Sequence, residues 1–337
     1  MINRFEKIQL AHGSGGLLMQ ELIRELLLKK LYNPFLSELR DSALVNFKKE
    51  RLAFTTDSFV VSPIFFKGGD IGKLAVCGTI NDLVVEAALP CYLSLSLIIE
   101  EGFSFLDLER IVNSIAFYAK KNKVYVVTGD LKVVEKGACD KIFINTSGIG
   151  RVIKEGLSIR EIKPQDKIIL TGTIGEHGLS ILSGRKNTPL DFGIRSDCSA
   201  LTDLLLPLLK KNLKIRFMRD PTRGGLATTL NEIASELNYC IMVEEESIPI
   251  KNKVKVACEL LGIDPLYLGN EGKAVLVVEK KDASGVLKIL KKHPLGKDAS
   301  IIGEVINQKG KNVLLKTLSR GIRILEPLRQ DPLPRIC

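Results

Sequence analysis

The hydrophobic positions in the first half of the chain predict strands and helices in turn. Leucine and serine alternate over residues 92–99, which is typical of a strand with one buried face. A helical pattern runs over residues 71–88, and Ser104 is placed to cap a second helix that ends near residue 121. The apolar run at residues 124–128 has the continuous character of a buried strand. The predicted strands are residues 52–56, 92–99, 124–128 and 141–149.

The second half alternates in the same way after a turn at Lys163-Pro164-Gln165-Asp166. Because the two halves are similar in size and each mixes both element types, the sequence predicts an α/β (α+β) protein with domains at residues 1–154 and 155–322. The predicted strands are residues 167–171, 240–244, 274–279 and 300–305, and the predicted helices are residues 199–211, 226–237, 254–261 and 282–292.

Residues 323–337 are predicted to form a mobile tail. Three prolines between Pro327 and Pro334 forbid a regular helix and favour an extended strip. The tail carries Cys337, whose thiol can therefore leave one site and enter another. The seven residues from Asp331 span roughly 23–25 Å when fully extended. The alternative interpretation is a frayed end without a role, because termini are usually poorly ordered.

Composition narrows the class of protein. The chain has 337 residues, of which 45% are hydrophobic and 26% charged, as expected for a globular protein with a proper core. No apolar run has the ~20 residues of a membrane span, and the first residues lack the apolar core of a signal peptide, so a cytoplasmic location is expected. The net charge is +10, but the basic residues form no aromatic-interleaved stripe, so no nucleic-acid partner is expected. The seven cysteines include no Cys-x-x-Cys pair, which argues against a disulfide framework or a zinc ribbon.

Five aspartates stand out by their positions. Asp57, Asp130 and Asp220 each follow an apolar run, Asp82 lies inside an apolar helix, and Asp41 lies between a helix and a strand. Each of them alone is consistent with a helix cap, a turn or a surface ion pair. Together they suggest oxygen ligands for a hard divalent cation, and magnesium shared with nucleotide phosphates fits that chemistry.

A glycine-rich loop precedes the first predicted helix. Its residues Gly13, Ser14, Gly15 and Gly16 permit close backbone approach, and the N–H groups at a helix start favour phosphate. A plain flexible turn is the alternative. The chain has no P-loop and no kinase signature, which excludes the common ATP-binding folds. His177 and His293 show no metal-ligand spacing and are interpreted as structural.

Taken together, these motifs resemble the HypE family of hydrogenase maturation proteins. That family is part of a superfamily with aminoimidazole ribonucleotide synthetase, selenophosphate synthetase and thiamine-monophosphate kinase. The cysteine at the end is the most specific feature, because other superfamily members lack it. Leu131 stands where the family usually has Thr, and Arg40 precedes Asp41 where superfamily members often have a second acid. The matching segments are Ala11–Gly16, Thr56–Ser58, Cys77–Asp82, Gly129–Val134, Arg219–Gly225, Asn270–Lys273, His293–Ala299 and Pro334–Cys337.

The resemblance implies a fold and a reaction. The N-terminal domain is expected to form a β-barrel with its copy in a homodimer, and ATP and magnesium (Mg²⁺) are expected between the two domains. The apolar strand faces expected to be buried against the copy carry Leu93, Leu95, Leu97, Ile142 and Ile144. A carbamoyltransferase, HypF, loads a carbamoyl group onto the terminal cysteine, here Cys337. The HypE protein then uses ATP to dehydrate this group to a thiocyanate. The cyanide passes to iron on a HypC–HypD scaffold during assembly of the NiFe hydrogenase centre.

The candidate residues suit this chemistry. Asp57, Asp82, Asp130 and Asp220 are expected to hold magnesium on the phosphates, with Asp41 as a further ligand. The loop from Gly13 to Gly16 is expected to close over the phosphates, and Lys132 to neutralise their charge. Two protons must also leave the carbamoyl nitrogen, which requires a base.

Glu271 and Lys132 are the candidates for this base, and the sequence does not choose between them. Two other functions stay open at this point. One is a kinase or synthetase of the same superfamily that acts on a free small molecule, and the other is a non-catalytic carrier of a thiol. The kinase or synthetase is distinguished by whether activity requires Cys337, and steady ATP hydrolysis that depends on loading of Cys337 would rule out the carrier.

Overall fold

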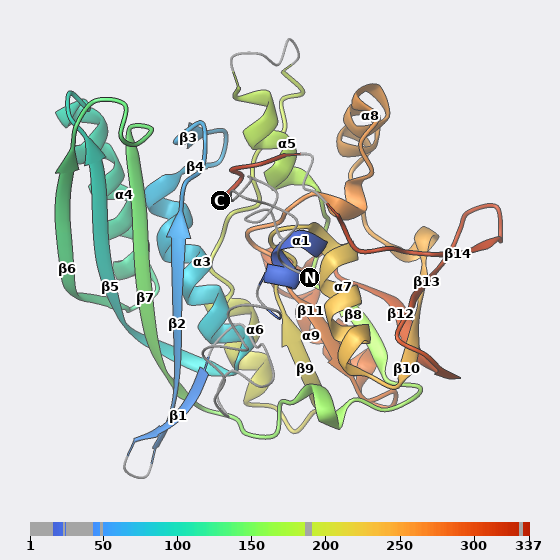
Figure 1. The fold of residues 1–337 in the computed structure, drawn as a ribbon. Helices are drawn as coiled ribbons and strands as arrows, with labels where there is room; N and C mark the ends of the chain where they lie inside the picture. The colour runs from blue at the N-terminus through green and yellow to red at the C-terminus, as the bar shows by residue number, and fades with distance from the viewer. Residues whose placement is uncertain (1–15, 23, 25–42, 48–49, 186–190, 330–332) are drawn as a thin grey trace.

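The computed structural model describes residues 16–22, 24, 43–47, 50–185, 191–329 and 333–337 (Figure 1). Within this part of the chain each half builds one large mixed sheet with helices packed on it. A small hairpin of β3 (Phe65–Phe66) and β4 (Gly69–Asp70) leads into the central helix. The predicted α/β class is confirmed.

The N-terminal sheet has the strand order β1-β2-β7-β5-β6, antiparallel except for the pair β5–β6. The alternation predicted over residues 92–99 is confirmed: Leu93 and Leu97 are buried under the helices, while Tyr92 and Ile98 lie on the open face. Its strands are β1 (Ala43–Phe47), β2 (Glu50–Phe59), β5 (Ala88–Glu100), β6 (Tyr125–Val134) and β7 (Ile142–Val152), and its helices are α3 (Ile71–Val85) and α4 (Phe105–Lys121).

The helix α4 begins and ends where the sequence predicts. The Ser104 side chain accepts a hydrogen bond from the backbone N–H of Asp107 (3.3 Å), which satisfies one of the free donors at the helix start. The interpretation of residues 124–128 as a buried strand is wrong. β6 lies at the edge of the sheet, and Tyr125 is 70% exposed. An apolar run alone does not show which neighbours a strand will have.

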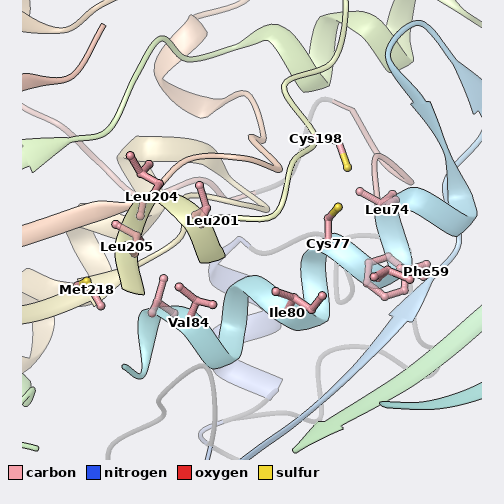
Figure 2. Close-up of a cluster of buried hydrophobic side chains, with 14 of the residues drawn as sticks. Phe59, Leu74, Cys77, Ile80, Val84, Cys198, Leu201, Leu204, Leu205 and Met218 are labelled. Carbon is pink, nitrogen blue, oxygen red and sulfur yellow. The ribbon is translucent and has the colours of Figure 1, made fainter. Parts of the chain in front are cut away.

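The helix α3 joins the two halves of the chain. It is buried along almost its whole length, because it lies between the N-terminal sheet and α6 (Thr202–Leu209) of the second half. Figure 2 shows Ile80 and Val84 of α3 on the side that faces Leu201 and Leu205. One hydrophobic core therefore runs through both halves, so the loops at their junction are held in fixed relative positions.

The C-terminal sheet has the strand order β14-β13-β10-β12-β8-β11-β9, and only β10 and β13 run parallel. One face packs on α7, through Leu170 and Val275, and the other packs on α6 and α9, through Ile169 and Leu276. Its strands are β8 (Lys167–Leu170), β9 (Ile215–Arg219), β10 (Tyr239–Glu244), β11 (Val275–Val278), β12 (Ser300–Lys309), β13 (Val313–Lys316) and β14 (Ile322–Ile324), and the helices besides α6 are α5 (Glu176–Ser183), α7 (Gly225–Glu236), α8 (Asn252–Leu261) and α9 (Ala283–Leu290).

Several short elements were not predicted from the sequence. β9 carries two arginines that interrupt its apolar pattern, and α5 is only eight residues long with a glycine inside it. α1 (Leu17–Leu22) falls within the helix predicted after the glycine-rich loop, but β13 and β14 are shorter still and were not predicted. In each case tertiary packing stabilises a segment whose local pattern is too short to identify.

The open face of the N-terminal sheet carries an apolar row. Phe54 pairs with Ile149, and Ile149 pairs with Tyr92, which is 48% exposed. A homodimer was expected to bury Leu93, Leu95, Leu97, Ile142 and Ile144 against the copy, but the structure buries four of these inside the chain and Leu95 partly. The face available to a partner is therefore the opposite one.

Candidate active site

Two carboxylates of the N-terminal half lie between β2 and α3. Asp82 of α3 accepts a hydrogen bond from the Thr55 hydroxyl of β2 (2.6 Å), and Asp57 of β2 accepts a longer one from Thr79 of α3 (3.4 Å). Asp57 was expected at the start of a loop, but β2 continues past it to Phe59. The strand therefore fixes the direction in which the Asp57 carboxylate points.

The C-terminal half contributes two loops that pack closely together. One follows β9 and contains Asp220 and Arg223; the other precedes β11 and contains Asn270 and Glu271. Gly225 begins α7 with a left-handed φ of 62°, and a Cβ there would come within 2.5 Å of the Leu268 carbonyl oxygen, so only glycine allows this approach.

Asn270 holds this arrangement together. Its side chain is fully buried, donates to the carbonyl oxygens of Pro221 (3.1 Å) and Leu268 (2.9 Å), and accepts from the N–H of Gly175 (2.8 Å). One amide thus joins three loops.

Glu271 lies at the centre of the junction and is only 4% exposed. Its carboxylate reaches towards α3, since a Cβ on Gly78 would lie 3.8 Å from Glu271 Oε2. Burial raises the pKa of the Glu271 carboxyl well above its usual range, and the neighbouring carboxylates, chiefly Asp220, raise it further, while Arg223 opposes the rise.

A buried ion pair between Asp197 and Lys273 contacts the backbone of Glu271. Asp197 Oδ1 accepts a hydrogen bond from the backbone N–H of Glu271 (3.1 Å), and Asp197 Oδ2 lies 3.2 Å from Lys273 Nζ. Both side chains of the pair are less than a tenth exposed. The pair fixes the backbone at Glu271, and negative charge at Asp197 adds to the rise of the Glu271 pKa.

The end of the chain is bound into the same junction. The backbone N–H of Val60 donates to the Cys337 carbonyl oxygen (3.1 Å), and the N–H of Ser62 donates to that of Arg335 (3.1 Å), so residues 335–337 run along the end of β2. Ile336 is 3% exposed and packs on Gly269, where a Cβ would come within 2.4 Å of Ile336 Cδ1. The structure thus gives the docked position of the predicted tail, whereas its mobility stays a prediction.

Charged and polar side chains anchor the docked tail, and one of them is Arg185, which donates to the Pro334 carbonyl oxygen. His177 is fully buried; its Nε2 lies 2.6 Å from the Ile336 carbonyl oxygen and its Nδ1 lies 2.8 Å from Ser196 Oγ. His177 therefore binds the tail in addition to packing in the core. His293 caps a short helix, which agrees with its interpretation as a structural residue. Arg335 donates to Asp140 (2.8 Å) and to the Val60 carbonyl oxygen (2.8 Å).

Arg223 lies within electrostatic reach of Cys337. The pKa of Arg223 is raised chiefly by negative charge at Cys337, and further by Asp57, Glu271 and Asp82, while partial burial opposes the rise. The charges of acids from both halves of the chain and of Cys337 therefore all act on Arg223. The Arg223 side chain is open to solvent. The sequence offered the segment Arg219–Gly225 as a signal, but no pattern within it distinguished Arg223 from Arg219.

Asp130 and Lys132 are not brought to this junction within one chain. They form an exposed ion pair (2.9 Å) on β6. Asp130 is aligned with Ser96 of β5 and hence with Asn145 of β7, which places it on the open face of the sheet. Asp57 lies on the other face, under α3, so strand parity separates the two acids.

Some candidate residues lie outside the described residues: Gly13, Ser14, Gly15 and Asp41. Gly16 is described and packs against the tail, since a Cβ at Gly16 would come within 2.6 Å of the Leu328 carbonyl oxygen. Among the described residues, no three His, Cys, Asp or Glu side chains converge closely enough to hold a metal ion by themselves. Carboxylates arranged in this way suit magnesium, which usually keeps several waters and takes further ligands from phosphates.

Comparison with known proteins defines the class. Family models of the AIR synthase related proteins match the chain, the N-terminal domain over residues 39–152 and the C-terminal domain over residues 163–316. The chain is therefore an AIR synthase-related protein of two domains. Within that class it belongs to the HypE family: it is 45% identical over 333 residues to the carbamoyl dehydratase HypE of Bradyrhizobium diazoefficiens, covering 98% of this chain and 96% of the relative.

Two solved structures agree with this assignment. A crystal structure of HypE in complex with ATP has a TM-score of 0.82 at 43% identity, covering 98% of this chain and all of the other. A crystal structure of a HypE–HypF complex has a TM-score of 0.85 at 46% identity, covering 91% and 99%. None of the helices in the described part of the chain is both long and apolar enough to span a membrane.

Proposed function

We propose that this protein is an ATP-dependent carbamoyl dehydratase that converts an S-carbamoyl group on Cys337 to a thiocyanate. The observation that carries the proposal is the docked tail, which holds Cys337 at the junction of the two halves. There, negative charge at Cys337 acts on Arg223, and the charges of Asp57, Asp82 and Glu271 act on the same side chain. The thiocyanate would supply cyanide to the iron of a NiFe hydrogenase centre. Membership of the HypE family over nearly the whole chain supports this.

The reaction proceeds in two steps. The carbonyl oxygen of the carbamoyl group attacks the γ-phosphorus of ATP, ADP leaves, and one proton leaves the nitrogen. The C–O bond of this phosphorylated intermediate then breaks, phosphate leaves with the oxygen, the second N–H proton is lost, and the C≡N bond forms. One ATP and one carbamoyl group thus give one thiocyanate, one ADP and one phosphate.

Charge neutralisation is the main task in phosphoryl transfer. Arg223 is positioned to bind the transferred phosphoryl group, since a guanidinium matches phosphate oxygens geometrically. Asp57, Asp82 and Asp220 would hold magnesium, which would shield the negative charge of the phosphates. The glycine loop that ends at Gly16 is proposed to cover the nucleotide.

Glu271 is the base that the geometry favours. It reaches the junction from the C-terminal half, whereas Lys132 of the same chain is paired with Asp130 on the other face of the sheet. Because its pKa is raised, the Glu271 carboxylate takes up a proton more readily than an ordinary glutamate does, which suits the role of a base.

A single-turnover experiment tests the proposal against its two alternatives. Chain loaded with a carbamoyl group by the carbamoyltransferase HypF is mixed with ATP, and ADP is counted against thiocyanate. We expect a ratio of one to one, and no ADP from unloaded chain. Phosphorylation of a free small molecule by unloaded chain would support a kinase instead, and thiocyanate without ADP would contradict the mechanism.

We predict that Asp82→Asn weakens magnesium-dependent ATP binding at least tenfold. The Thr55 hydroxyl can still donate to the amide oxygen, so the fold is expected to survive, but a hard ligand for the cation is lost. Calorimetric titration with ATP and magnesium measures the change, and Asp203→Asn, an exposed acid on α6, is the matched control. Unchanged affinity combined with lost folding would assign Asp82 to structure instead.

We also propose a homodimer that buries the open face of the N-terminal sheet, so that two such sheets close into a barrel. Tyr92→Glu is expected to convert the dimer to a monomer, because a charge would enter the apolar row that Tyr92 forms with Phe54 and Ile149. Light scattering distinguishes the two states. The control Leu260→Glu, at an exposed position on α8, should stay dimeric. A wild-type monomer at micromolar concentration would contradict the proposal.

HypF and the HypC–HypD scaffold are the proposed partners. Loading and unloading of Cys337 by large partners requires the tail to leave its docked position. The contacts that hold it are all noncovalent: hydrogen bonds near Val60 and Ser62, the buried Ile336, His177, Arg185 and the Arg335–Asp140 ion pair. The HypE–HypF complex of a close relative supports the first partner.

A further inference from the structure

His177 on α5 has two ring nitrogens that face different parts of the molecule. Nε2 lies 2.6 Å from the carbonyl oxygen of Ile336 in the tail, and Nδ1 lies 2.8 Å from Ser196 Oγ. The ring also packs edge-on against Phe66, with the two ring centroids 5.6 Å apart. Because the side chain is fully buried, both nitrogens depend on protein partners while the tail is docked.

These partners decide which nitrogen of His177 carries the hydrogen. A carbonyl oxygen can only accept, so Nε2 donates to Ile336 and therefore carries the hydrogen. Burial lowers the pKa of His177, so the ring is neutral at neutral pH and its second nitrogen is bare. Nδ1 is thus an acceptor, and the Ser196 hydroxyl donates to it.

Ser196 is itself held in place by its neighbours. Its backbone N–H donates to the Lys67 carbonyl oxygen (2.8 Å), and its Oγ accepts from the N–H of Cys198 (3.0 Å). Gly68 packs tightly against it, since a Cβ there would come within 2.8 Å of the Ser196 carbonyl oxygen. The hydroxyl hydrogen is left to point at Nδ1, so Ser196 keeps His177 ready to donate to the tail.

The hydrogen bond from His177 helps to set the direction of the terminal side chain. The Ile336 carbonyl group immediately precedes Cys337, and the Cys337 carbonyl oxygen accepts from the N–H of Val60 (3.1 Å). The two bonds fix the carbonyl groups on either side of the Cys337 Cα. Together they therefore fix the direction in which the Cys337 side chain leaves the backbone.

We propose that His177, kept in its Nε2–H form by Ser196, is a positioning residue that aligns Cys337 for dehydration. It acts through the Ile336 carbonyl oxygen. Because loading of the thiol by a partner requires the tail to leave, this hydrogen bond serves the dehydration step and not the loading step. The inference rests on the proposed function for its effect on rate, but the hydrogen bond itself can be tested without ATP or a carbamoyl group.

Hydrogen exchange of the unloaded chain tests whether His177 holds the tail. The backbone N–H groups of Val60 and Ser62 donate to the tail, so their protection measures how often it leaves. His177→Gln keeps an N–H donor at the position of Nε2, whereas His177→Asn keeps a polar group only at the position of Nδ1. We expect His177→Asn to lower this protection about tenfold and His177→Gln to retain it. Equal protection in the two variants would overturn the proposal.

Nitrogen-15 NMR of the imidazole side chains shows directly where the hydrogen lies. The chain has three histidines, and the signal that is missing from His177→Gln identifies His177. We expect a neutral ring with its hydrogen on Nε2. A hydrogen on Nδ1 alone, or on both nitrogens at neutral pH, would contradict the proposal.

Ser196→Ala tests the second link. It leaves the buried Nδ1 without its donor, so protection of the Val60 amide should fall several-fold. The same substitution should have no such effect in His177→Gln, which has no Nδ1 to satisfy. The control Ser183→Ala removes a half-buried hydroxyl that donates to the Leu179 carbonyl oxygen (2.8 Å), and it should leave protection unchanged. An equal fall in both backgrounds would assign Ser196 to the packing of its own loop and overturn its part in the proposal.

The consequence for the reaction is measured in two separate steps. His177→Asn should be loaded by HypF at the wild-type rate, but the loaded variant should form thiocyanate at least several-fold more slowly in a single turnover, because the thiol is no longer aligned. A loss of both rates together would show a folding defect and overturn the positioning role. Lost protection with an unchanged dehydration rate would overturn the role of the docked tail in the reaction, and with it the observation that carries the proposed function.

Discussion

Cys337→Ala is expected to abolish thiocyanate formation while leaving ATP affinity nearly unchanged. The sulfur of Cys337 is the atom that carries the carbamoyl group, so the alanine variant cannot carry the substrate of the reaction. The backbone contacts of residue 337 with Val60 and the packing of Ile336 on Gly269 do not involve the sulfur, so the tail should still dock. Product is measured as thiocyanate on the C-terminal peptide, and affinity by calorimetry.

The matched control is Cys139→Ala. Cys139 is half-buried like Cys337 but lies in the segment between β6 and β7, beside Asp140, which binds the tail through Arg335. This variant should form thiocyanate at the wild-type rate. Thiocyanate from the Cys337→Ala variant, or its loss in Cys139→Ala, would show that the reacting thiol has been assigned to the wrong residue.

Glu271→Gln is expected to lower the single-turnover rate by about 10² to 10⁴, the usual contribution of a positioned base. Burial and neighbouring carboxylates raise the pKa of Glu271, and only the ionised form accepts a proton. The wild-type rate should therefore increase with pH across this raised pKa, and the variant should lose that increase. The exposed Glu246→Gln is the control, with rate and pH profile unchanged.

The same substitution should not destabilise the fold. A carboxyl with a raised pKa in the native state stabilises the protein below the unfolded-state pKa, and this contribution is lost as the pH increases through the native pKa. At neutral pH the amide avoids the loss, so thermal unfolding of Glu271→Gln should occur at the wild-type temperature or above it. A lower unfolding temperature together with a normal rate would assign Glu271 to structure.

The regular elements were predictable where their pattern was long. The helix after Ser104 and the strand around Leu93 follow directly from a capping residue and an alternation that packing did not override. The strand around Val126 was assigned to the interior because its residues are apolar, yet it lies at a sheet edge. Whether an apolar strand is central or peripheral depends on pairing with distant strands, which one segment cannot reveal.

The site was predictable only in part. The sequence singled out Asp57, Asp82 and Glu271, and the structure places them around one junction, although their roles stay predictions. It grouped Asp130 with them, because the register between β2, β7, β5 and β6 decides which face an acid occupies and is set by the whole sheet.

Other site residues had no readable signal. Asn270 acts by joining three loops from distant parts of the chain, a role that no local pattern records. Arg335 donates to Asp140 and Val60, and the cation whose pKa is raised by charge at Cys337 is Arg223, which lies far earlier in the chain and shares no local pattern with the tail.

The most direct test of the account is the mass of the C-terminal peptide, followed before and after ATP is added to the loaded protein. We predict that the peptide containing Cys337 first gains one carbamoyl group and then loses one water when ATP and magnesium are present. Fragmentation should place both changes on the sulfur of Cys337. A carbamoyl group on Cys139 or Cys198, or one on Cys337 that ATP leaves intact, would contradict the account.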